Sequence, residues 1–206
     1  MNSKRILVVD DQLARALRLR GLLHEAGYQT SWAESAADAM VTACRERPVL
    51  TLIEARLPNQ SAVPLGGMLR DQLEAQWACV VDQTADIDEF RRTASSGALA
   101  LIIRPADLRL VAPTVDTAVA CAVEIHRLRE TGRQLHEALE QSRTTSVAAG
   151  ILMERFRLDR HRAIGLLRDN ARSQRRRLAD IAEEVLASVE RINGALGAPR
   201  GSNGMR

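Results

Sequence analysis

Short apolar runs alternate with amphipathic segments through the first half of the chain. The runs have the length of buried strands and cover residues 5–9, 28–32, 49–53, 78–81 and 99–103. Between them, apolar positions repeat with a helical period over residues 13–26, 35–47, 64–73 and 87–96. Gly27 and Ser35 are the residue types expected just after a helix and at a helix N-cap. The alternation predicts an α/β domain over residues 1–110, with a five-stranded, doubly wound parallel sheet covered by helices on both faces.

Beyond residue 110 the strand pattern stops and a long helical pattern begins. Small and apolar positions recur at spacings of 3, 4 and 7, at Ala118, Cys121, Ile125, Leu128, Leu135 and Leu139. Such a seam is typical of a coiled coil, although Gly132 weakens it locally and Pro113 marks a kink or a restart. Residues 111–143 therefore predict a parallel two-helix dimer. The alternative is one amphipathic helix that packs on its own domain.

Residues 144–193 predict a small all-α unit of three helices. Its expected core positions are Leu152, Leu166, Leu167, Leu178, Ile181 and Val185, with the unit's single aromatic, Phe156, as a further candidate. Ala148 and Gly150 are small enough for helix backbones to approach closely there. The segment 194–206 is rich in Gly and Ser and is predicted to be a disordered tail.

Composition narrows the class of protein. The chain has 206 residues, a net charge of +3 and only 2% aromatic residues, which disfavours base stacking on a row of rings. It has neither the ~20-residue apolar run of a membrane helix nor a signal peptide, so a cytoplasmic protein with no membrane partner is expected. Its three cysteines and four histidines are scattered. With no nucleophile–base set and no glycine-rich phosphate loop, the sequence predicts no enzyme and no cofactor.

The first 110 residues resemble the receiver domain of bacterial response regulators, a flavodoxin-like fold. The motifs that carry the resemblance are VVDD at residues 8–11, EARLP at 54–58, QTA at 83–85 and GALALIIRP at 97–105. In that family an acidic pair holds Mg²⁺, an aspartate takes the phosphoryl group, and a hydroxyl and a lysine sense it. Asp10, Asp11 and Thr84 match, whereas Glu54 replaces the aspartate and Arg104 replaces the lysine.

The replacement at residue 54 changes what the pocket can do. Glutamate is one methylene longer than aspartate, which moves its oxygens by roughly 1–1.5 Å and misaligns them for in-line transfer. Arg104 is able to pair bidentately with Glu54. The expectation is a pseudo-receiver that is not phosphorylated on Glu54, and the alternative is a purely structural ion pair. Asp10 and Asp11 keep the oxygen ligands of hard cations, so weak Mg²⁺ binding stays open although no metal is expected.

Residues from about 143 to 189 resemble the ANTAR domain, the RNA-binding module of the AmiR and NasT antitermination regulators. Matching positions lie in all three helices: Ala148, Gly150, Ile151, Leu152 and Met153, then Ala163, Leu166, Leu167, Arg168 and Ala171, then Arg176, Arg177, Leu178, Ile181, Ala182 and Val185. The chain departs from the family pattern at Ala149, Ile164 and Arg172. The candidate RNA-binding residues are Ala149, Gly150, Arg155, Arg168, Arg172, Arg175, Arg176 and Arg177.

The resemblance implies a homodimer that binds hairpins in a leader transcript. Bound hairpins stop a terminator from forming, so that RNA polymerase continues. It also implies control by a protein partner that senses a small molecule, because phosphorylation is not expected. Two other functions remain open: a DNA-binding response regulator, and a protein-interaction adaptor that has lost RNA binding. The last helical segment is acidic and apolar, which disfavours a DNA recognition helix.

Overall fold

The structure is a computed structural model that describes residues 5–58, 60–83, 87–104 and 107–195. Its contacts divide the chain into two units, Met1–Leu128 and Arg129–Arg206. The helix α5 (Leu108–Phe156) contributes residues to both units. Each unit is described by itself below.

The first unit is built on a five-stranded parallel sheet, as the sequence predicts. The strands are β1 (Arg5–Val9), β2 (Gln29–Ala33), β3 (Leu50–Glu54), β6 (Trp77–Asp82) and β7 (Leu101–Arg104), in the order β2-β1-β3-β6-β7. Successive side chains point to opposite faces, so Ile6 and Val8 enter one core while Leu7 and Val9 enter the other. Both faces are therefore buried, which explains why the strands other than the edge strand β2 are mainly apolar runs and not alternating patterns.

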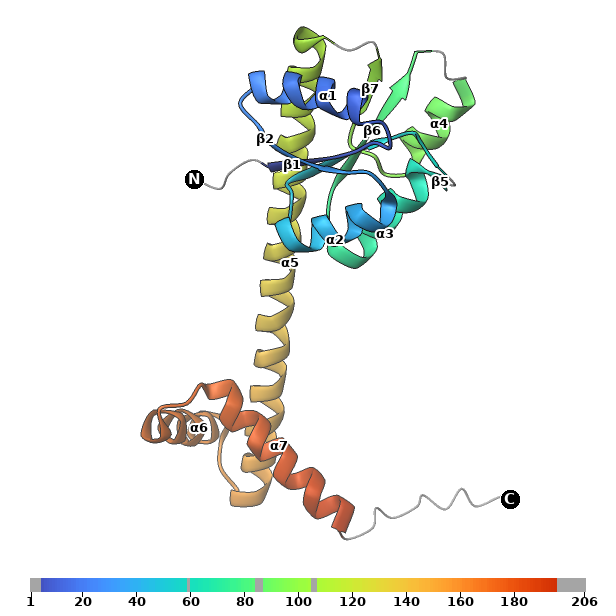
Figure 1. Cartoon of the computed structure of the whole chain (residues 1–206). Helices are drawn as coiled ribbons and strands as arrows, with labels where there is room; N and C mark the ends of the chain where they lie inside the picture. Colours follow the sequence, from blue (N-terminus) through green and yellow to red (C-terminus); the bar gives the residue numbers. More distant parts are fainter. Residues whose placement is uncertain (1–4, 59, 84–86, 105–106, 196–206) are drawn as a thin grey trace, which may run out of the picture. The chain divides into compact units, whose positions relative to one another are not determined.

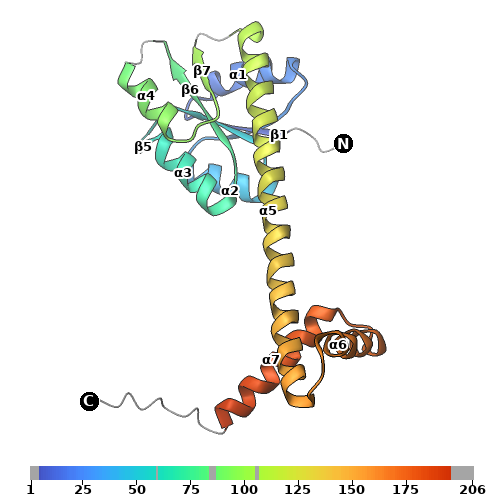
Figure 2. The same ribbon diagram turned by 180° about the vertical axis from the view of Figure 1, so that it is seen from behind.

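Helices cover both faces of this sheet (Figures 1 and 2). One core joins it to α1 (Leu13–Glu25) and the start of α5, and the other joins it to α2 (Ala36–Glu46) and α3 (Ala62–Leu73). The helix α4 (Ile87–Ser95) lies between β6 and β7 in sequence. Both predicted end signals are present: Gly27 has φ +84°, and the Ser35 hydroxyl accepts from the Asp38 N–H at 3.2 Å.

Two local features differ from the sequence prediction. A short antiparallel hairpin, β4 (Arg56–Leu57) and β5 (Gln60–Ser61), precedes α3, which begins two residues earlier than predicted. Strands of two residues are too short to leave a periodic pattern. The helix α5 also runs through Pro113 without a restart. Proline removes one backbone hydrogen bond, and here the loss falls near the helix start, where the Asp107 side chain accepts from the Leu110 N–H at 3.1 Å.

The first predicted seam residue belongs to the domain core. Ala118 is 1% exposed and packs in the sheet core with Val115 and Val119. Its assignment to a dimer seam is therefore wrong, because no partner helix can reach it. The early part of α5 follows the alternative, an amphipathic helix that packs on its own domain. Further along the seam Cys121 is exposed and Ile125 is half-buried, and Leu128, Leu135 and Leu139 are 63%, 61% and 68% exposed.

The second unit packs the end of α5 against α6 (Arg160–Gln174) and α7 (Leu178–Ala195). Its buried residues are small or branched: Ala148, Ala149, Ala163, Leu167, Ala171, Ile181 and Ala182. Two expected core residues lie outside, since Leu166 is 43% and Phe156 58% exposed. A Cβ added at Gly150 meets no atom within 4 Å, so this glycine does not serve a close helix contact.

The predicted tail overlaps the last helix by two residues. The helix α7 ends at Ala195, and residues 196–206 of the tail lie outside the described part of the chain. In the described ranges, none of the helices has an apolar stretch of the length needed to cross a bilayer.

Candidate functional site

The predicted receiver pocket forms at the carboxyl edge of the sheet. Asp10 and Asp11 follow β1, Glu54 ends β3 and Arg104 ends β7, and parallel pairing brings these ends together. Asp10 and Glu54 are each 5% exposed. Thr84, the remaining predicted member, lies outside the described residues.

Arg104 pairs with Glu54 through one nitrogen. Its Nη2 lies 2.9 Å from Oε1 and 2.8 Å from Oε2, and the first contact is an aligned hydrogen bond. Oε2 of Glu54 and Nε of Arg104 are buried without a hydrogen bond of good geometry among the described residues. The contact is therefore not the bidentate fork that the sequence suggested.

Burial and charge act in opposite directions on Glu54. Removal of the carboxylate from water raises its pKa, while Arg104, Arg15 and a hydrogen bond from the Arg56 backbone N–H lower it, and Asp10 raises it again. The net shift is upward. Even with a cation in contact, the buried carboxylate is thus held less strongly in its charged form than an exposed glutamate.

Arg15, in the first turns of α1, is a pocket residue that sequence reasoning missed. Its Nε lies 3.1 Å from each oxygen of Asp10, and its Nη2 lies 2.8 Å from Oδ1 of Asp10 and 2.8 Å from Oδ1 of Asp11. The hydrogen bond to Asp10 is the main reason that the pKa of Arg15 is raised. The sequence held one clue, because Arg15 follows Asp11 by four residues across the predicted start of α1.

These contacts test whether the pocket fits the Mg²⁺ ion that a receiver fold implies. Asp10 and Asp11 both accept from Arg15, and Arg104 Nη1 lies 3.8 Å from the second oxygen of Asp10. Within the described ranges, no group of three or more acidic, His or Cys side chains is placed to hold a metal ion. The residues present do not fit the ion, because guanidinium groups already occupy the carboxylates.

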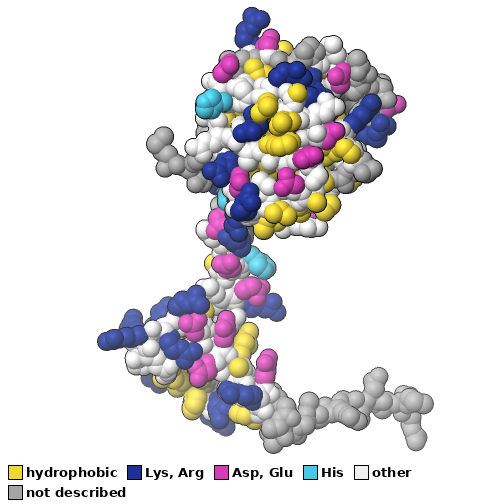
Figure 3. Space-filling model, in the orientation of Figure 1, with side chains coloured by type: hydrophobic (Ala, Val, Ile, Leu, Met, Phe, Trp, Pro, Cys, Tyr) yellow, Lys and Arg dark blue, Asp and Glu magenta, His cyan; other side chains and the backbone are white. Residues whose placement is uncertain are grey.

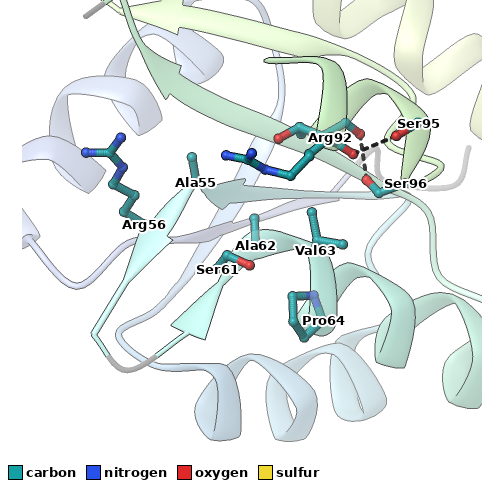
Figure 4. A pocket seen from close by; sticks show the side chains of 10 residues that line it. Ala55, Arg56, Ser61, Ala62, Val63, Pro64, Arg92, Ser95 and Ser96 are labelled. Atoms are coloured by element: carbon teal, nitrogen blue, oxygen red, sulfur yellow. Dashed lines mark hydrogen bonds between the residues drawn. The ribbon is translucent and has the colours of Figure 1, made fainter. Parts of the chain in front are cut away.

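A separate pocket lies beside the β4–β5 hairpin, between the start of α3 and the end of α4 (Figure 4). Arg56 and Arg92 line it, and its other lining residues are small or hydroxyl-bearing: Ala55, Ser61, Ala62, Val63, Pro64, Thr93, Ser95 and Ser96. Two guanidinium groups at one concave site favour an acidic ligand group.

The predicted RNA-binding residues of the second unit separate into three sets. Arg172, Arg176 and Arg177 have intramolecular partners, at 3.8 Å from Asp169, 2.6 Å from Glu184 and 3.0 Å from Asp180. By contrast Arg155, Arg168 and Arg175 are exposed and make no side-chain ion pair or hydrogen bond in the part of the chain described, nor do Arg157 and Arg160. Figure 3 shows Lys and Arg side chains gathered over α6, with acidic groups among them.

The third set consists of the two small residues. Ala149 is 2% exposed and lies in the core of the unit, so its assignment to RNA contact is wrong. Gly150 is exposed and open to solvent. Of these two neighbours on α5, only Gly150 is accessible to a ligand.

Both interhelix turns of the unit hold an arginine in the left-handed backbone region. Arg157 has φ +51° and Arg175 has φ +52°. Non-glycine residues rarely adopt this conformation, which costs roughly 1–2 kcal/mol. Arg157 follows Phe156 in sequence and Arg155 precedes it, and all three side chains are exposed at the α5–α6 turn. The sequence did not point to Phe156 as a candidate RNA-binding residue, because hydrophobicity favoured a core position for its ring.

Comparisons with known proteins bear on both units. Residues 133–186 match the ANTAR domain. The transcriptional regulatory protein PdtaR of Mycobacterium tuberculosis is 22% identical over 187 residues, which cover 90% of this chain and 91% of that protein. The structure of the response regulator StyR has a TM-score of 0.59 at 16% identity, covering 87% of this chain and 98% of StyR.

A response regulator receiver domain protein from Methanospirillum hungatei resembles the first unit. Its TM-score is 0.52 at 22% identity, covering 59% of this chain and 97% of that protein. The parallel sheet and its likeness to this structure show that the N-terminal domain has a receiver-like fold. The C-terminal unit contains the segment that matches the ANTAR domain, so the chain combines a receiver-like domain with an ANTAR domain.

Proposed function

We propose that this protein is a transcription antitermination regulator that binds RNA hairpins in a leader transcript through its C-terminal unit. The observation that carries the proposal is the exposed ring of Phe156 next to Arg155 and Arg157, two arginines without a side-chain partner among the described residues, inside the segment that matches the ANTAR domain. Bound hairpins prevent a terminator from forming, and RNA polymerase continues into the operon.

The chemistry of this surface suits single-stranded loops of RNA. Guanidinium groups bind phosphate and stack on bases, and an exposed phenyl ring stacks on an unpaired base. Stacking of one base on one aromatic ring contributes roughly 1–3 kcal/mol. Because the side chains of Arg155, Arg168 and Arg175 have no ion pair among the described residues, they would bind phosphate without breaking one.

The test is recovery of nucleic acids from the source cell with the full-length protein at moderate salt. Wild type is expected to enrich paired hairpins upstream of terminators, and F156A is expected to lose most of this enrichment. The matched control is Leu166→Ala, which removes another exposed apolar side chain of the same unit. Enrichment of duplex DNA would favour the DNA-binding alternative, and recovery of nothing specific would favour the adaptor.

A homodimer through the exposed part of α5 is the second element of the proposal. Leu128, Leu135 and Leu139 are mostly exposed at seam spacing, and a partner helix would bury them. Two linked units would bind two neighbouring hairpins with a gain from effective concentration. In sedimentation, L135K/L139K is expected to be monomeric, whereas the off-seam control H136K is expected to match wild type.

Control by a protein partner, without phosphorylation of Glu54, is the third element. Glu54 is buried and pairs with Arg104, and its extra methylene would misalign its oxygens for in-line phosphoryl transfer. The pocket that contains Arg56 and Arg92 would accept an acidic side chain of a small-molecule-sensing partner. A stoichiometric acid-labile adduct after treatment with acetyl phosphate would contradict this element, and so would the lack of any co-purifying protein under all ligand conditions.

A further inference from the structure

Arg15 occupies the position in the pocket where a divalent cation would meet the acidic pair. Its guanidinium contacts both oxygens of Asp10 and one oxygen of Asp11, all at 2.8–3.1 Å. We propose that Arg15 is a built-in cation that keeps Mg²⁺ and similar metal ions out of the receiver-like pocket. This inference concerns the first unit and does not depend on RNA binding.

Geometry makes the guanidinium and a metal ion mutually exclusive. Mg²⁺ takes an octahedral set of oxygen ligands at about 2.0–2.1 Å and keeps several waters. Both carboxylates would have to turn their oxygens away from Arg15 to reach such a shell. The Asp10 side chain is also held by the backbone, because its Oδ1 accepts from the Gln12 N–H at 2.8 Å as well as from Arg15. A metal ion could enter only by expelling the Arg15 side chain.

Charge acts in the same direction. The pocket holds three carboxylates, of Asp10, Asp11 and Glu54, and two guanidinium groups, of Arg15 and Arg104. Its formal charge is thus close to balance, and a divalent cation would make it net positive. Repulsion between a metal ion and a guanidinium within a few ångströms is large at low dielectric.

Arg15 is the decisive cation of the two. Arg104 is committed to Glu54, and its nearest approach to Asp10 is 3.8 Å. Arg15 makes the only side-chain contacts recorded for Asp11 in the described part of the chain. Removal of Arg15 alone would therefore uncover both members of the acidic pair while leaving the pair of Glu54 and Arg104 in place.

An intrinsic probe reports on the site. The indole Nε1 of Trp32 donates to the backbone oxygen of Asp10 at 2.9 Å, whereas Trp77, the other tryptophan, is buried in the core. The experiment titrates the full-length protein with Mg²⁺ and, separately, with Mn²⁺. Tryptophan fluorescence and calorimetry are followed for wild type, R15Q and R15M.

The matched control is R18Q, which removes an exposed arginine from the same helix without touching the pocket. Wild type and R18Q are expected to show no saturable change, and R15Q and R15M are expected to saturate with a Kd of about 0.1–1 mM, as for weak oxygen sites. Far-UV circular dichroism checks that each variant is folded. Two Arg15 variants of different polarity are used, so that the test still stands if one of them does not fold. Metal binding by wild type as tight as by R15Q would overturn the proposal, as would folded Arg15 variants that bind no metal.

Discussion

Arg175→Gly is expected to make the C-terminal unit more stable and at the same time weaker in RNA binding. Arg175 follows α6 with φ +52°, and its N–H donates back into the last turn to the carbonyl of Arg172. The next residue, Arg176, donates its N–H to the Ala171 carbonyl at 3.0 Å, which completes the turn. Both bonds are made by the backbone, so glycine keeps them.

The size of the stability gain follows from two opposing effects. The left-handed conformation costs a residue with a Cβ about 1–2 kcal/mol, and glycine removes this cost. Glycine also raises the conformational entropy of the unfolded chain, which lowers the free energy of unfolding by about 0.4–1 kcal/mol. The net gain is about 0.5–1 kcal/mol in the free energy of unfolding, or about 2–8 °C in the melting temperature of a domain of this size.

The loss in binding has a separate cause. The Arg175 side chain makes no internal ion pair among the residues described, and the proposal gives it a phosphate contact. Loss of one charged hydrogen bond weakens binding by about 1.5–3 kcal/mol, roughly tenfold or more in Kd. The slope of log K against log salt should become shallower by about 0.7–0.9 for each lost phosphate contact.

The assay measures thermal melting and RNA affinity, at three salt concentrations, on the hairpin recovered with wild type. The control is Arg47→Gly, since Arg47 has the same backbone strain, with φ +46°, but lies in the receiver-like unit. That variant should gain stability and keep wild-type affinity. An R175G protein that melts higher yet binds RNA with unchanged affinity and salt slope would refute the argument that the strained turn is kept for its side chain.

Two further predictions concern the first unit. G66A should destabilise it by about 1–3 kcal/mol or more, since the added Cβ would lie 2.1 Å from the Trp77 ring, whereas G67A, with no atom within 4 Å, should be neutral or gain up to about 1 kcal/mol, as measured by urea unfolding. Because the pKa of Glu54 is raised above its usual value of 4.5, the folded state binds a proton more readily than the unfolded state. The stability of wild type relative to E54Q should therefore rise as the pH falls through the folded pKa and be lost above it. Unfolding free energies at about pH 5 and about pH 7.5 that differ in the opposite sense would show that the ion pair with Arg104 dominates over burial.

The sheet could be predicted because its pattern is set by burial on two faces. Every strand except the edge strand β2 is mainly an apolar run bounded by polar or turn residues, and parallel pairing then brings Asp10, Glu54 and Arg104 to one edge. The position of the pocket thus follows from strand order alone. The β4–β5 hairpin could not be found in this way, because two-residue strands bury too little to leave a period.

The side-chain partners could not be predicted from pattern. The helical period of the apolar positions places Arg15 on a helix. It does not show that the guanidinium contacts the acidic pair and not solvent, which depends on tertiary packing. Alanine fits both a heptad seam and a domain core, so the sequence alone does not assign Ala118 to either. In the structure α5 packs on the sheet at this point, which places Ala118 in the domain core. Phe156 was assigned to the core on hydrophobicity alone, whereas the alanines of the three helices fill that core without it.

Arginine has opposite roles in the two units, and pairing distinguishes them. In the receiver-like pocket, Arg15 and Arg104 pair with the buried carboxylates of Asp10 and Glu54. These carboxylates neutralise the charge of the two arginines, so the arginines do not attract an anion from solution. In the C-terminal unit, Arg155, Arg168 and Arg175 are exposed and have no carboxylate partner among the described residues, so their charge remains available to phosphate. The net charge of +3 does not indicate where an anion would bind. The charges of the receiver-like pocket neutralise one another, whereas those of the exposed arginines in the C-terminal unit do not. The salt dependence of RNA binding should therefore depend on substitutions of the exposed arginines and be indifferent to R15Q, which separates the two roles in one titration.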